Sequence, residues 1–99
     1  MLYVKVHKSY RDVVAICDAD LLGKHFEEDD RQINVKHSFY EGDKKTPEEA
    51  LKIIKDLARE DSTFNIVGKK AIELALQAGI ISKDGIKEIQ GIPFALVLM

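Results

Sequence analysis

Two segments near the N-terminus carry the residue patterns of β-strands. Residues 2–7 alternate between an apolar side and a polar side, and residues 13–17 form a short apolar run. The polar residues 9–12 between them have the length of a hairpin loop. Two more strands are predicted: residues 32–39, where Ile33, Val35 and His37 share one face, and residues 92–99, an apolar run expected to be covered on both faces.

The middle of the chain has the three- and four-residue apolar spacing of helices. Thr46 and Glu49 have the spacing of a capping box around Pro47, so a helix is predicted to begin there and to end near residue 61. Residues 64–68 introduce a second helix that ends at Gly79 and is apolar over more of its circumference, which predicts deeper burial.

Three shorter segments complete the pattern. Residues 18–23 suit one helical turn ended by a left-handed Gly23. The acids at 27–30 suit a solvated loop, and residues 82–89 form a short amphipathic piece. The order is strand, strand, turn, strand, helix, helix, strand. It predicts an α+β fold in which a small mixed or mainly antiparallel sheet has two helices packed on one face.

Length and composition predict a single globular domain, residues 1–99. The chain has 99 residues, of which 45% are apolar, enough for one hydrophobic core. Its apolar runs are far shorter than the roughly 20 residues needed to span a bilayer, and its start lacks a secretory pattern. We therefore expect a cytoplasmic protein without membrane contact. The apolar ending 94–99 would be a sticky edge strand if unpaired, so both a monomer and a homodimer are open.

Charge and cysteine content narrow the possible chemistry. The net charge of −2 excludes the strongly basic footprint of a general nucleic-acid binder but allows a local basic patch. Cys17 is the only cysteine, which excludes an internal disulfide and a zinc site built on paired thiolates. The spacing of His7, His25 and His37 matches no compact ligand motif, so neither a metal nor a cofactor is expected.

The segment from Asn65 to Lys70 is the most suggestive. It places Gly68, Lys69 and Lys70 at the start of a helix, where backbone N–H groups and the helix dipole favour an anion. A phosphate of RNA or of a small ligand could bind there. The second glycine and the Ser or Thr of a complete phosphate loop are missing, which argues against nucleotide hydrolysis. A structural interpretation stays open, with Asn65 as a cap or turn residue and Gly68 as a close-packing site.

Over nearly its whole length the chain resembles an archaeal family known as domain of unknown function 424. The shared pattern is Cys17-Asp18-x-Asp20-Leu21-Leu22-Gly23-Lys24-x-Phe26, Phe39-Tyr40, Asn65-x-Val67-Gly68 with Ala71 and Ala75, Gly79, and Ile89-x-Gly91-Ile92-Pro93 followed by Ala95. The family tends to have histidine where this chain has Phe94. The resemblance implies an archaeal source, no established activity, and an association with the translation machinery.

Two functional hypotheses follow. The first is a non-enzymatic binding module that contacts the ribosome, RNA or a translation-related protein. It would use Lys24 and the segment from Asn65 to Lys70, with exposed tyrosines, Tyr3, Tyr10 or Tyr40, for stacking. The alternative is a small enzyme or small-ligand-binding protein with a cleft between residues 18–26 and 65–70, where Asp18, Asp20 and His25 would titrate. The first is favoured because no acid–base pair or metal cluster can be assembled.

Overall fold

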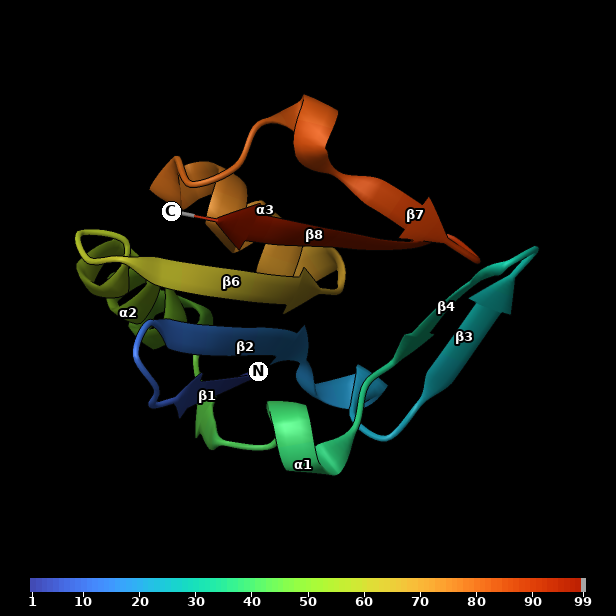
Figure 1. Ribbon diagram of the computed structural model, residues 1–99, viewed down its shortest axis with the longest axis horizontal. Coiled ribbons are helices and arrows are strands. Elements are labelled where there is room, and N and C mark those ends of the chain that lie inside the picture. The colour runs from blue at the N-terminus through green and yellow to red at the C-terminus, as the bar shows by residue number, and fades with distance from the viewer. Residues whose placement is uncertain (99) are drawn as a thin grey trace.

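A six-stranded sheet forms the centre of the computed structural model, which describes residues 1–98 (Figure 1). In spatial order its strands are β5 (Asp43–Lys45), β1 (Leu2–His7), β2 (Asp12–Asp18), β6 (Ser62–Val67), β8 (Ile92–Leu98) and β7 (Lys87–Ile89). Neighbouring strands are antiparallel except for β2 and β6, which are parallel. A separate hairpin consists of β3 (His25–Glu28) and β4 (Arg31–Asn34). The predicted mainly antiparallel α+β fold is confirmed.

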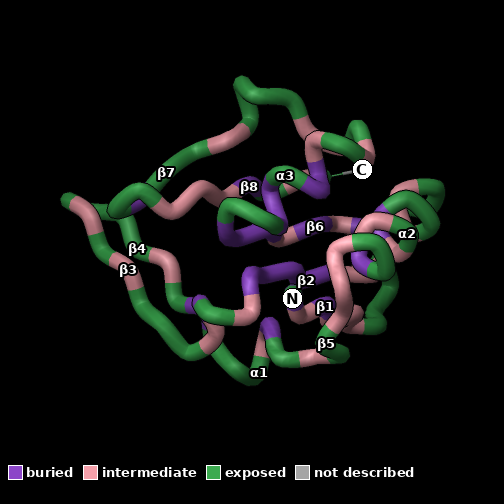
Figure 2. The backbone as a smooth tube through the Cα atoms, turned by 180° about the vertical axis from the view of Figure 1, so that it is seen from behind, coloured by how far each residue is buried: buried purple, intermediate pink, exposed green. Residues whose placement is uncertain are grey.

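Two helices, α2 (Pro47–Leu57) and α3 (Lys69–Ala78), cover one face of the sheet. Their apolar stripes meet the inward residues of the central strands, which Figure 2 shows as a buried band through the molecule. Among the buried residues of this main core are Leu2, Val14, Ile16, Ile54, Phe64, Ile66, Ala71 and Ala75. As predicted, α3 is the more buried helix, with four buried residues against two in α2.

The chain between residues 19 and 40 covers part of the opposite face. It contains the single turn η1 (Ala19–Leu21), the β3–β4 hairpin and the short helix α1 (His37–Tyr40). A second buried cluster forms there from Ala15, Cys17, Leu21, Val35, Tyr40 and Val67. The expectation that an apolar final strand is covered on both faces is wrong, because Leu96 and Leu98 on this side are 62% and 72% exposed.

Four other sequence expectations need correction. The strand expected over residues 32–39 ends at Asn34, and His37 to Tyr40 form α1, because Tyr40 is buried against the sheet and Phe39 stacks on the His7 ring at 4.7 Å. The acids at 27–30 are part of the hairpin, with Asp29 in its turn at φ 58°. Residues 62–67 are the central strand β6, and 82–89 contain η2 (Lys83–Gly85) and β7.

The two predicted left-handed glycines are present, Gly23 at φ 86° and Gly79 at φ 76°.

The final strand β8 is less exposed to pairing by another chain than expected. Its residues 92–94 pair with β7, and β6 pairs along its other side. The outer edge of β8 is thus shielded at its first half, which limits how much of it another chain could extend.

The capping box at the start of α2 gives a direct test of local stability. The Thr46 hydroxyl accepts a hydrogen bond from the Glu49 N–H (3.2 Å), and the Glu49 carboxylate accepts one from the Thr46 N–H (2.9 Å). We expect Thr46→Ala to lower the free energy of unfolding by about 1 kcal/mol in urea titrations. Ser82→Ala is the matched control, because the Ser82 side chain makes no capping bond, and an equal loss in both variants would contradict this account.

Candidate functional site

The carboxyl ends of the parallel strands β2 and β6 meet at one edge of the sheet. Asp18 ends β2, and its carboxylate accepts hydrogen bonds from the backbone N–H groups of Lys70 (3.1 Å) and Ala71 (2.9 Å) in the first turn of α3. Gly68 has φ 113°, and a Cβ atom added there would lie 2.4 Å from the Asp18 Cγ. The two segments that the sequence singled out therefore meet through a buried carboxylate.

This contact changes the phosphate prediction. The N–H groups expected to bind an external anion already bind Asp18, so backbone phosphate binding by Lys70 and Ala71 is corrected to an internal helix cap. Gly68 is a close-packing site, as the structural interpretation held. Asn65 is neither a cap nor a turn residue, because it lies in the middle of β6.

The acidic and thiol groups at this edge are poorly suited to catalysis. Burial raises the pKa of Asp18 above its ordinary value, although the hydrogen bonds from Ala71 and Lys70 act in the opposite direction. Burial, aided by the Asp18 charge, raises the pKa of the Cys17 thiol to about 12. Cys17 is therefore not a nucleophile at neutral pH, and it is buried, as the sequence indicated.

The three histidines have separate partners. His7 Nε2 lies 2.8 Å from the carbonyl oxygen of Phe39, His25 Nε2 lies 3.1 Å from Glu27, and His37 Nδ1 lies 2.9 Å from Glu41. Residues 1–98 contain no group of three His, Cys, Asp or Glu side chains that could hold a metal. Asp20 and His25 are exposed.

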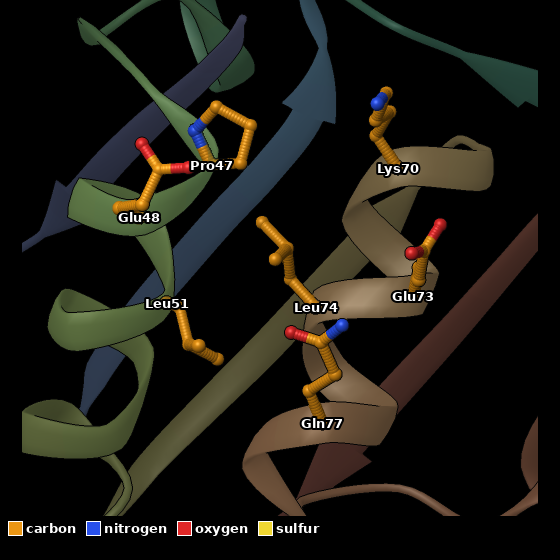
Figure 3. Close-up of a pocket in the computed structure, with 7 residues that line it drawn as sticks. All are labelled: Pro47, Glu48, Leu51, Lys70, Glu73, Leu74 and Gln77. Atoms are coloured by element: carbon orange, nitrogen blue, oxygen red, sulfur yellow. The ribbon is translucent and has the colours of Figure 1, made fainter.

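Two of the predicted basic residues, Lys69 and Lys70, begin α3 at this same edge, and the third, Lys24, directly precedes β3. Lys24, Lys69 and Lys70 are all exposed, and none takes part in the salt bridges found within residues 1–98. Lys70 also lines a groove of about 200 Å³ between α2 and α3, together with Glu48 and Glu73. In Figure 3 the Lys70 side chain extends toward the N-terminal end of α3, away from Glu73. The acids disfavour an anion inside the groove and leave the helix end as the accessible basic surface.

A second concave surface, which we call the hairpin cleft, lies between β4, α1 and the open face of β6 and β8. It has a volume of about 290 Å³. Its lining includes Gln32, Asn34, Tyr40, Asn65, Phe94 and Leu96, and no charged residue lines it. Neither this cleft nor the groove is lined by Asp18, Asp20 or His25, so neither is the cleft predicted between residues 18–26 and 65–70.

Among the amides that line the cleft, the sequence pattern points only to Asn65. It predicts that Gln32 and Asn34 lie in a strand but identifies no pairing strand, and it marks Phe94 only as a difference from the family pattern. Tyr40, expected as an exposed stacking residue, is 7% exposed, and burial raises its pKa to about 12, so its hydroxyl stays protonated. A polar residue inside an apolar strand is the one local signal that could have pointed to this cleft.

The hairpin is tied to the far end of the sheet by polar contacts at its tip. Glu28 accepts a hydrogen bond from the Gln90 N–H (2.8 Å), and Arg31 donates to the Glu88 carbonyl oxygen (3.1 Å). The Gln90 side chain donates to the carbonyl oxygen of Glu27. Figure 1 shows the tip of β3 and β4 reaching toward the turn between β7 and β8. These contacts hold one wall of the hairpin cleft in place.

The contact between Gly68 and Asp18 generates a stability prediction. We expect Gly68→Ala to destabilise the fold by about 3 kcal/mol, because the new Cβ strains a positive φ and displaces the carboxylate. Gly79→Ala is the control: its φ is also positive, but its Cβ would meet nothing within 4 Å, so its loss should be only about 1 kcal/mol. Equal losses in urea unfolding would show that the Asp18 contact is unimportant.

The raised pKa of Asp18 predicts how stability depends on pH. A carboxyl that binds its proton more tightly in the folded state contributes stability below its ordinary pKa and loses it as pH rises through the folded pKa. The free energy of unfolding of the wild type, relative to that of the non-titrating Asp18→Asn variant, should therefore fall across the acid range and then level off. A rise with pH would mean that the two N–H bonds outweigh burial.

Comparisons with known proteins agree with this fold. Within residues 1–98, no helix is long and apolar enough to cross a membrane. A search of curated proteins finds no match. The structure is similar to the crystal structure of an uncharacterized conserved protein from Methanopyrus kandleri, with a TM-score of 0.86 and 27% identity over 98% of this chain and 91% of that one. The family model "Protein of unknown function (DUF424)" matches residues 7–99, so the chain belongs to this family.

Proposed function

We propose that this chain is a non-enzymatic binding module of the archaeal translation machinery, located in the cytoplasm, that contacts RNA through Lys24, Lys69 and Lys70. The observation that carries the proposal is the exposure of Lys69 and Lys70 at the start of α3 and of Lys24 before β3, without salt-bridge partners among residues 1–98. Exposed lysines of this kind bind phosphates without reading sequence.

The commitment of the titratable groups to structural roles supports binding over catalysis. Asp18 caps α3, Cys17 is a buried thiol with a high pKa, and each histidine has its own local partner. An enzyme of the acid–base or nucleophilic kind needs such groups to converge on a substrate cavity. Neither the groove nor the hairpin cleft is lined by Asp18, Cys17 or a histidine.

Because the net charge of the chain is −2, the proposed RNA contact is confined to a local basic surface. The acids of the hairpin tip, Glu27 to Asp30, lie at the other end of β3 from Lys24, so an RNA strand could approach the lysines while the tip points away. Association with the ribosome is part of this proposal and comes from the expectation attached to the family resemblance, whereas the similar protein from Methanopyrus kandleri supports an archaeal source.

Ribosome co-sedimentation tests the proposal. The wild type should sediment with archaeal ribosomal subunits at low salt, and a triple variant with Lys24→Glu, Lys69→Glu and Lys70→Glu should not. With a labelled single-stranded RNA, losing three phosphate contacts should reduce the slope of log K against log salt by about 2. Glutamates in the first turn of α3 suit the helix dipole, and circular dichroism would verify the fold.

A matched variant keeps the charge change but moves it. Lys52→Glu, Lys55→Glu and Lys83→Glu alter three lysines that are also exposed, on α2 and η2, and this variant should sediment like the wild type. Equal losses in both triple variants would indicate non-specific attraction. A wild type that fails to sediment at low salt would overturn the proposal.

A further inference from the structure

We infer that the hairpin cleft binds one unpaired nucleobase, so that the RNA recognised by this chain is single-stranded. The inference rests on the proposed function, because it takes RNA as the ligand. It adds a site that the lysines alone do not supply: a cleft of about 290 Å³ at the lower end of the range for ligand pockets, which suits one planar group.

The lining of the cleft has the chemistry that reads a base. Gln32, Asn34 and Asn65 contribute side-chain amides, each of which offers both donors and an acceptor to a base edge. Among the side-chain hydrogen bonds within residues 1–98, none uses these three amides. Because no charged residue lines the cleft, its occupant should be the uncharged part of a ligand, while phosphates stay outside.

Asn65 is the residue that folding alone explains least. It lies in the central strand β6, where asparagine is disfavoured, and the strand register places it between Ala15 of β2 and Leu96 of β8. A polar side chain at the centre of a sheet, facing a cleft and lacking a partner in the described chain, is explained by a ligand that hydrogen-bonds to it.

Phe94 and Lys87 provide the remaining contacts. The register places Lys87 of β7 directly opposite Phe94 of β8, so both side chains lie on the same face of the sheet as the cleft. Phe94 is partly buried against the second cluster, which fixes its ring as a stacking surface. Lys87 is exposed at the rim, where it can reach the phosphate of a base stacked on Phe94.

An extended peptide fits this surface less well. Peptides that add to sheets pair with a free strand edge, whereas the cleft lies over the face of β6, which is paired on both sides with β2 and β8. Amide side chains, an aromatic ring and a rim lysine instead match the three contacts that a nucleotide makes, namely base edge, base face and phosphate.

Fluorescence anisotropy tests the inference. It compares binding of two labelled eight-nucleotide single strands, oligouridylate and oligoadenylate, with binding of a duplex of the same length. The wild type should bind at least one single strand more tightly than the duplex. Asn34→Ala and Asn65→Thr should each weaken that binding by about tenfold, the loss expected for an amide pair on a base edge. Phe94→Leu should weaken it by at least about fivefold through lost stacking. Threonine suits a strand, so Asn65→Thr should fold.

Two controls and three outcomes make the test decisive. Gln77→Ala removes an exposed amide from α3, and Thr63→Ala alters the same sheet face outside the cleft; both should bind RNA like the wild type. If only the lysine variant loses RNA, the proposed function stands and the cleft inference is overturned. If the wild type binds no RNA, both fail. If the cleft variants lose binding to a ribosomal protein but bind RNA like the wild type, the cleft is a protein-binding site and the inference is wrong.

Discussion

The fold depends on the buried carboxylate of Asp18 and the two backbone N–H groups that it binds at the start of α3. This contact joins the end of β2 to the helix that follows its parallel neighbour β6, and its tight fit against the backbone requires glycine at position 68. From Asp18 the chain turns through η1 onto the face of the sheet opposite α2 and α3. The position of the hairpin, and so of the cleft beneath it, follows from that turn.

The same contact supports the proposed binding role, because it uses the ionisable groups that catalysis would need. Asp18 and Cys17 are the buried ionisable groups nearest the carboxyl edge, and both are used in packing. The polar groups that the proposal uses are of another kind: amides of β4 and β6 that line the hairpin cleft, and exposed lysines at its rim and at the start of α3. Such groups hold a ligand without making or breaking its bonds, which suits RNA recognition.

Sequence-based prediction succeeded for features whose pattern depends on near neighbours in the chain or repeats over a long segment. The capping box at Thr46, the left-handed Gly23 and Gly79, and the apolar stripes of α2 and α3 depend on neighbours within a few residues, and all were predicted. It failed for β5 and β7, which have three residues each, and for the hairpin, whose strands have four. Segments that short have too few alternations to show a period, and pairing with distant strands decides their conformation.

By itself, the sequence determined the α+β fold class, the two main helices and the two segments, 18–26 and 65–70, that meet at the carboxyl edge. Only the tertiary structure decided what those segments do. The anion at the start of α3 comes from a residue 52 positions earlier in the chain, so a site that looks open in the sequence is filled in the fold. The hairpin cleft likewise takes its amides from β4 and β6, which are brought together by long-range packing and not by any local pattern.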